Sequence, residues 1–333
     1  MSETYVDIIV SEEEGAGVQP GVSLADALSE VPPGVIGAEG PERLHGLADP
    51  VTVSGRYKLL TLDSPDAMNL FWHSGAHLLA QAVRRLYPRA KLGIGPAIRD
   101  GFYYDFDFGE PISADALEAI EAEMRRCAKA NEPIKRAVLS RSDALEFFKT
   151  EGQDYKLELI EALPETEQIS TYSQGEFTDL CRGPHLPSNG PLKHFKLTAV
   201  TGAYWRGDER NPMLQRIYGT AYPTAKQLKA HLTRLEEAKK RDHRLLGKQL
   251  DLFALFPEAP GAPFWKPKGV ILVNAVKDYM RDLLRRRGYD EVNTPLIMTR
   301  DLWERSSRRP DPTDLLESHR DEERGKTGDA AGQ

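Results

Sequence analysis

The sequence contains little cysteine, no long hydrophobic run and no excess of positive charge. Cys127 and Cys181 are its only cysteines, too few for the disulfide framework of a secreted domain. No apolar run is long enough to cross a membrane, and the start of the chain does not resemble a signal peptide. We therefore expect a cytoplasmic protein that does not span a membrane.

The charge balance argues against a generic polyanion binder. The 44 basic residues are outnumbered by 51 acidic ones, which gives a formal net charge of −7. Local basic faces remain possible, so a specific contact with RNA is not excluded. The 333 residues are 40% hydrophobic and 29% charged, as expected of an ordered protein with two or three domains.

Two short motifs carry most of the chemical information. His73 and His77 form an H-x-x-x-H motif, and Cys181 and His185 form a C-x-x-x-H motif farther along the chain. Residues four apart share one face of a helix, so the first two imidazoles project together. If the fold joins both motifs, the cluster suits either a zinc ion or acid–base chemistry. For the first motif alone, a packed, hydrogen-bonded histidine pair is the alternative.

Local signals predict a mixed α+β chain. Ser64, Pro65 and Asp66 combine a cap, a first-turn proline and an acid, so a helix should begin there and end before Pro88. Further helices are expected over 23–31, 112–130 with Ser113 as cap, 142–150, a long segment opened by Thr224, and 271–287. Strands are expected over 5–10, 51–55, 57–62, 93–98, 101–107 and 195–201.

Several side chains around these elements are candidates for a site. Tyr103 and Tyr104 face opposite sides of a strand, so one of them can face a pocket. Asp179 and Arg182 add an acid and a cation to the C-x-x-x-H turn. Arg206 lies among aromatic residues that could clamp a nucleotide, although an aromatic core with a charged rim explains them equally well. Lys156 alone reads as a solvated charge, and Cys127 as a core residue.

At the level of longer segments, the chain resembles the amino-terminal half of a threonyl-tRNA synthetase. The resemblance runs from about residue 60 to 305 and rests on HSGAHLLAQAV, GFYYDFD, DLCRGPH, GAYWRGD, LQRIYGTAY and KRDHRLLGKQLDLF. Editing domains of alanyl-tRNA synthetases share the histidine and cysteine motifs. The tryptophan-bearing segment and RIYGTAY favour the threonyl family.

The resemblance implies a domain order within the α+β class. It implies a small ubiquitin-like β-grasp (TGS-like) domain over 1–62, an α+β editing domain over 63–223 and a linker helix over 224–250. The start of a class II synthetase catalytic domain, with Pro295 in its first motif, would cover 251–305. Residues 306–333 are charged and poor in apolar residues, the composition of a disordered tail.

The implied activity is hydrolysis of serine wrongly attached to threonine tRNA. Such a second site is needed because a synthetic pocket gains only about 1–3 kcal/mol from a single methyl group. By resemblance, Asp179 would hold the substrate ammonium group, and Lys156 and His73 would position the ribose or the water. His77, Cys181 and His185 would shape a pocket for serine. The substrate-binding candidates are Tyr103, Tyr104, Arg182 and Arg206.

The resemblance also sets expectations for cofactors and partners. Editing in this family needs no metal, so zinc on His73, His77, Cys181 and His185 is the lesser alternative. The family's ATP, magnesium and catalytic zinc are not expected, because the later class II motifs are not found after residue 306. The expected partner is the acceptor end of threonine tRNA, with a full-length synthetase or a second copy of this chain as further candidates. A non-catalytic binding module and a degraded relic are the alternative functions.

Overall fold

The computed structural model describes residues 6–9, 15–28, 30–113 and 115–293. The chain divides into two compact units, with the boundary between Lys239 and Lys240. The first unit holds an amino-terminal module, residues 6–62 as far as they are described, and the region that carries both motifs. Among the described helices, none is both long and apolar enough to cross a membrane.

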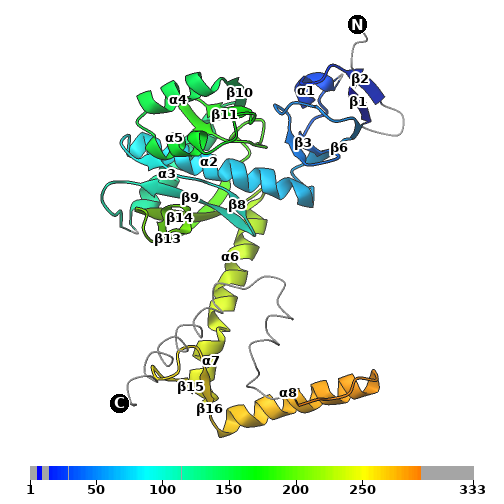
Figure 1. Ribbon diagram of the computed structural model, residues 1–333, viewed down its shortest axis with the longest axis vertical. Helices are drawn as coiled ribbons and strands as arrows, with labels where there is room; N and C mark the ends of the chain where they lie inside the picture. The colour runs from blue at the N-terminus through cyan, green and yellow to red at the C-terminus, as the bar shows by residue number, and fades with distance from the viewer. Residues whose placement is uncertain (1–5, 10–14, 29, 114, 294–333) are drawn as a thin grey trace, which may run out of the picture. The chain divides into compact units, whose positions relative to one another are not determined.

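The amino-terminal module contains two three-stranded sheets, ordered β2-β1-β5 and β4-β3-β6 (Figure 1). Its elements are β1 (Val6–Ile9), β2 (Gly15–Val18), α1 (Leu24–Ala27), β3 (Val35–Glu39), β4 (Leu44–Gly46), β5 (Gly55–Arg56) and β6 (Lys58–Thr61). The predicted helix over 23–31 is too long, since Leu28 is already extended. The predicted strand over 51–55 is wrong except at Gly55. Val51 instead pairs with the Val22 loop and is buried in the module's core. The TGS-like assignment stays a prediction.

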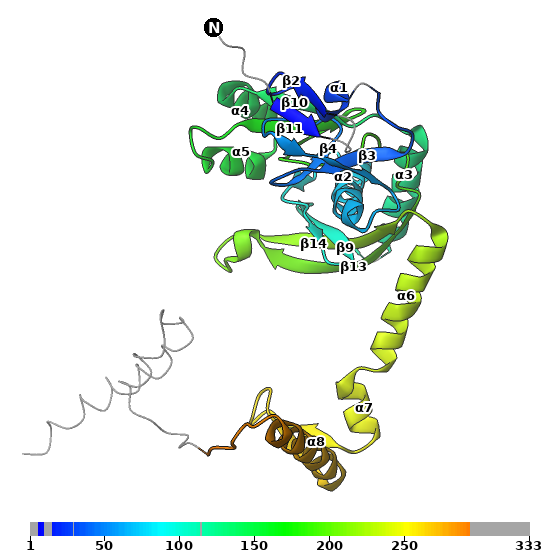
Figure 2. The ribbon, with the colours of Figure 1, turned by 90° about the vertical axis from the view of Figure 1, so that its right-hand side faces the viewer.

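The helix that carries both histidines begins and ends where the sequence indicates. A short 3₁₀ turn, η1 (Pro65–Ala67), leads into α2 (Met68–Leu86), which stops before Pro88. Ser64 does not cap the helix; its hydroxyl accepts the Thr61 N–H at 3.1 Å. In Figures 1 and 2, α2 lies between the sheet of β9, β13 and β14 and the elements around β11.

Two antiparallel sheets and three further helices build the region around α2. One sheet has the order β13-β14-β9-β7, with β8 on β9, and the other has the order β10-β11-β12. The elements are β7 (Lys91–Leu92), β8 (Ala97–Ile98), β9 (Gly101–Asp107), α3 (Ala116–Ala130), β10 (Lys135–Leu139), α4 (Arg141–Thr150), α5 (Asp154–Glu161), β11 (Ile169–Gln174), β12 (Phe177–Leu180), β13 (His194–Tyr204), η2 (Trp205–Gly207) and β14 (Met213–Tyr222).

Two local predictions fail in this region for reasons of tertiary contact. Helix α3 starts at Ala116 with Asp115 as its cap residue, not at Ser113, because Gln215 binds both backbone groups of Ile112 and holds it outside the helix. Only Ala97–Ile98 of the predicted strand 93–98 forms a strand. Cys127 is fully buried, as predicted.

One hydrophobic core joins the amino-terminal module to the motif-bearing region. Ile36 and Leu60 from the module belong to the same buried cluster as Leu70 on α2 and Phe102 on β9. Burial of large apolar side chains is the main favourable term in packing of this kind. The module and α2 are therefore held together by shared core residues.

The predicted long helix after Thr224 is divided in two. It forms α6 (Ala225–Lys240) and α7 (His243–Gln249), and the Asp242 side chain caps α7 by accepting the Arg244 N–H at 2.8 Å. The second unit continues with β15 (Phe253–Leu255), β16 (Pro263–Trp265) and α8 (Pro267–Arg286). Its class II assignment stays a prediction. Pro295 and the tail predicted over 306–333 lie outside the described residues.

Candidate functional site

The fold joins the two motifs into one compact cluster. The His185 ring lies 4.2 Å from the His73 ring and 4.1 Å from the His77 ring, measured between centroids. The Cys181 Sγ lies 3.4 Å from His73 Nε2 and 3.2 Å from His185 Nε2. Helix α2 supplies the first pair, and the turn after β12 supplies the second. The i, i+4 spacing predicted that His73 and His77 share one face of the helix. The approach of Cys181 and His185 to that face depends on the packing of the sheet and could not be predicted from spacing.

The hydrogen bonds around the cluster determine its tautomers. The Pro184 carbonyl oxygen is only an acceptor, so His73 Nδ1, 3.1 Å away, must carry the hydrogen. The neutral His73 ring then accepts at Nε2, from the Cys181 thiol. Ser74 accepts the Leu186 N–H at 2.9 Å, and its own hydroxyl can then donate to His185 Nδ1 at 3.2 Å. His73 is left with a basic nitrogen directed at the cysteine.

Burial keeps this cluster uncharged. It lowers the pKa of His73, lowers the pKa of His77 to about 3 and lowers the pKa of His185 well below its ordinary value. Burial also raises the pKa of the Cys181 thiol to about 12. At neutral pH the three imidazoles are therefore neutral, and the thiol is protonated and not a nucleophile.

A buried ion pair lies next to the cluster. Lys156 Nζ is 2.6 Å from Asp179 Oδ1, and both side chains are 2% exposed. The Tyr104 hydroxyl donates to Asp179 Oδ2 at 2.5 Å and accepts from Lys156 at 3.1 Å. Burial raises the pKa of Asp179, but Lys156, His77 and Tyr104 together outweigh it, and the net pKa lies below the ordinary value. Lys156 is thus a buried charge, which its sequence context did not indicate.

A small pocket opens over His73. Its volume is about 240 Å³, and its lining consists of Asn69, His73, Pro96, Ala97, Gly183 and Pro184. Of the cluster, only His73 lines it. Asn69 was not among the predicted residues, although its position one turn before His73 places it on the same helical face. Ser74 was also missed, because a serine beside a histidine carries no signal of its own.

Three of the sequence-predicted residues lie away from the cluster. The Tyr103 ring packs under the Arg216 guanidinium, 3.8 Å from it, on the other face of β9 from Tyr104. The Arg182 side chain is 72% exposed and pairs with Glu167. Arg206 lies over the Trp205 ring and donates to the Glu158 carbonyl oxygen. Their proposed contacts with substrate stay predictions.

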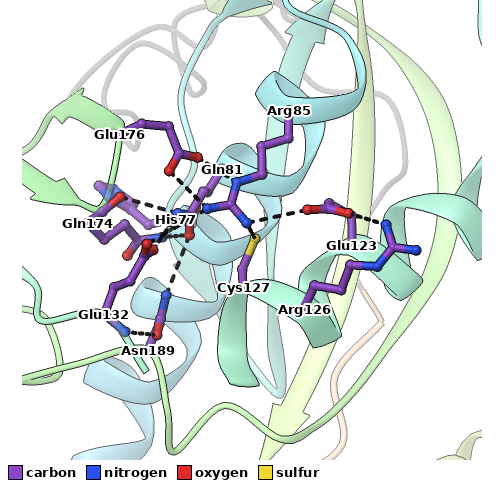
Figure 3. Close-up of polar contacts among 10 residues, drawn as sticks. All are labelled: His77, Gln81, Arg85, Glu123, Arg126, Cys127, Glu132, Gln174, Glu176 and Asn189. Carbon is purple, nitrogen blue, oxygen red and sulfur yellow. Dashed lines mark hydrogen bonds and ion pairs between the residues drawn. The ribbon is translucent and has the colours of Figure 1, made fainter. Parts of the chain in front are cut away.

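A buried polar network continues along α2 beyond His77 (Figure 3). Gln174 Nε2 donates to the His77 carbonyl oxygen at 3.3 Å and to Gln81 Oε1 at 2.9 Å. Gln81 in turn donates to Glu132 at 2.8 Å. The network extends to Arg85, Glu123, Arg126, Cys127, Glu176 and Asn189. It ties the turn of α2 that bears His77 to β11 through the His77 carbonyl oxygen.

The same four motif residues are compatible with zinc. Their ligand atoms all lie within 4.8 Å of one another. Tetrahedral zinc needs bonds of about 2.0–2.3 Å to nitrogen and sulfur, so small side-chain movements would complete the site. Cys181 would have to lose its proton first, which its raised pKa opposes in the metal-free protein.

The buried histidines make stability depend on pH. His77 has a folded pKa of about 3 against an ordinary 6.5, so the unfolded chain binds more protons below pH 6.5. The unfolding free energy should therefore fall as pH falls from 7 to 5, by up to about 1.4 kcal/mol per pH unit for each such group. Urea unfolding at both pH values measures this. His77→Gln should reduce the pH dependence of the unfolding free energy, whereas His243→Gln, at an exposed position, should leave it unchanged. The same pH dependence in the wild type and both variants would contradict this prediction.

Comparisons with known proteins identify the relatives of this chain. Residues 169–218 match the family described as the threonyl and alanyl tRNA synthetase second additional domain. The matched segment of this chain includes Asp179, Cys181 and His185. The threonine–tRNA ligase of Carboxydothermus hydrogenoformans is 53% identical over 264 residues, which cover 79% of this chain and 42% of that protein. The ligase of Syntrophomonas wolfei is 50% identical over 290 residues, covering 86% of this chain and 46% of the relative.

A third relative gives the same result. The threonine–tRNA ligase of Methylococcus capsulatus is 50% identical over 289 residues, covering 86% of this chain and 45% of its own length. The chain thus spans less than half the length of each of these curated relatives. Identity near one half over most of the chain, together with the domain match, agrees with the resemblance seen in its motifs. Over most of its length, the chain therefore belongs to the threonyl-tRNA synthetase family.

Proposed function

We propose that this chain hydrolyses the ester of serine attached to threonine tRNA. The observation that supports this most is His73, a neutral imidazole that lines the pocket with its Nδ1 hydrogen fixed on the Pro184 carbonyl oxygen. A neutral imidazole with a fixed tautomer suits activation of water once the Cys181 thiol turns away and leaves Nε2 able to accept a proton. The acceptor end of threonine tRNA would bring the ester into the pocket.

The proposed step moves one proton through His73. A water molecule in the pocket gives a proton to His73 Nε2 as its oxygen attacks the ester carbonyl carbon. The carbon–oxygen bond to the ribose then breaks, and the ribose oxygen takes the proton back from His73. The products are free serine and tRNA with its hydroxyl restored. The Cys181 thiol, which donates to Nε2 in the resting site, holds the ring ready and forms no covalent bond.

The rest of the cluster would bind and select the aminoacyl group. The pocket is small and has short apolar walls at Pro96, Ala97 and Pro184, which suits rejection of threonine's extra methyl group. Asp179 carries the negative charge that a substrate ammonium group requires. Because that carboxylate is buried and bound to Lys156, the ammonium group would have to reach it through an opening of the cluster.

The direct test is deacylation of Ser-tRNA(Thr) and Thr-tRNA(Thr) by the purified chain, before and after treatment with a chelator. We expect loss of serine only, and the same rate after chelation, since water activation by His73 requires no metal. A rate that chelation abolishes and zinc restores would transfer the water-activating role to a metal on the cluster. Binding of tRNA with no hydrolysis of either ester would contradict the proposal and favour a binding module.

A further inference from the structure

A carboxylate from the amino-terminal module reaches the back of the pocket. Asp49 follows β4 and is fully buried. Its Oδ2 accepts the Gly46 N–H at 3.1 Å and an N–H of Arg43 at 3.2 Å, both within the module. Its Oδ1 accepts the hydroxyl hydrogen of Tyr172, which lies on β11 in the motif-bearing region. Asp49 is thus a polar link between two parts of the chain that also share a hydrophobic core.

Tyr172 contacts both Asp49 and the cluster. It lies directly opposite Asp179 in the β11–β12 pairing, so the two side chains share one face of the sheet. Its ring packs on the His185 ring, with centroids 4.6 Å apart and planes at 59°. The tyrosine therefore touches His185 of the cluster and lies beside Asp179 of the adjacent ion pair, while its hydroxyl is held by Asp49.

The backbone of the C-x-x-x-H turn closes directly on the same two groups. A Cβ on Gly183 would lie 2.1 Å from the Tyr172 hydroxyl oxygen and 3.2 Å from Asp49 Oδ1. A Cβ on Gly46 of the module would lie 2.5 Å from the His185 carbonyl oxygen. Both glycines are needed for close approach, and Gly183 also lines the pocket. The module is packed against the turn that forms one pocket wall.

We propose that Asp49 is a positioning residue for the site: through Tyr172 it fixes the turn 181–185, so the amino-terminal module is a working part of the hydrolytic site. The effect of Asp49 on catalysis rests on the proposed hydrolysis. Its effect on the position of the turn rests on the geometry alone.

The test compares two buried tyrosines in the full chain. Tyr172→Phe removes the hydroxyl bound to Asp49, whereas Tyr57→Phe removes one that binds only the Val53 carbonyl oxygen inside the module. Asp49→Ala and Asp49→Asn complete the set, because asparagine keeps an acceptor oxygen for Tyr172. The readouts are kcat and KM for Ser-tRNA(Thr), and the rate at which iodoacetamide alkylates Cys181 after chelator treatment, followed by mass spectrometry with Cys127 as the internal reference.

We expect Asp49→Ala and Tyr172→Phe to lower kcat by about tenfold or more, with little change in KM, because a shifted turn misplaces the reacting groups. Both should speed alkylation of Cys181. The double variant Asp49→Ala/Tyr172→Phe should lose no more activity than Asp49→Ala alone, and Asp49→Asn should retain most of the activity. The proposal would be overturned if Asp49→Ala hydrolysed Ser-tRNA(Thr) and reacted with iodoacetamide at the wild-type rates. It would also be overturned if Tyr57→Phe changed these rates as much as Tyr172→Phe. If the wild-type chain hydrolyses nothing, faster alkylation in Tyr172→Phe but not Tyr57→Phe still supports positioning while the hydrolytic function fails.

Discussion

Replacing Lys156 by methionine is expected to destabilise the chain by about 3–5 kcal/mol and to abolish hydrolysis of Ser-tRNA(Thr). The ammonium group is 2.6 Å from Asp179, and both side chains are buried. Removal of the lysine leaves a carboxylate without a partner in a medium that solvates it poorly. Urea unfolding at pH 7 measures the loss of stability.

The pH dependence of this loss provides a sharper test. Without Lys156, burial raises the pKa of Asp179 above its unfolded value, so the variant loses stability as pH rises. The difference between wild type and Lys156→Met should therefore widen between pH 5 and pH 8. A difference that does not vary with pH would show that the lysine acts by packing rather than by charge.

A surface pair of the same residue types serves as the control. Lys91 lies 2.5 Å from Asp154, but these side chains are 40% and 61% exposed. Lys91→Met should cost about 0–1 kcal/mol, because water already solvates both charges. In the double variant Lys156→Met/Asp179→Leu, stability should largely return and hydrolysis should not. Comparable losses in Lys91→Met and Lys156→Met would rule out burial as the cause.

His73→Ala is expected to lower the rate of serine ester hydrolysis by about 10²–10⁴-fold, the range for loss of a general base. His73 is the one cluster residue that lines the pocket, and its Nε2 is the basic nitrogen of its neutral ring. The loss should appear in kcat, since the pocket walls that bind substrate remain. Single-turnover deacylation at pH 7 measures it.

The matched control for this variant is His231→Ala. His231 is also buried, but it contacts Tyr222 and Arg234 at the start of α6 and lies outside the pocket lining. Its replacement should leave the rate unchanged. If His73→Ala keeps the wild-type rate while both variants remain folded, water activation belongs to another group, such as a ribose hydroxyl of the substrate.

Local sequence patterns predicted the parts of the site that depend on one element. The spacing of His73 and His77 placed both imidazoles on one face of α2, and the alternation along β9 separated Tyr103 from Tyr104. The choice between those tyrosines needed the fold, because only the position of Asp179 on β12 decides which face of β9 is the site. The position of Arg206 also needed the fold: its aromatic neighbour Trp205 holds it at α5, away from the cluster.

Spacing along the chain and motif identity were enough to predict the family, the mixed α+β class, the extent of α2 and the residue types of the cluster. The tertiary structure alone decided that Lys156 is a buried ion-pair partner, that the thiol and imidazoles are neutral, and that Asp49 reaches Tyr172. Ionisation and long-range contact depend on which groups lose water together, and that is set by packing between segments that no local pattern connects.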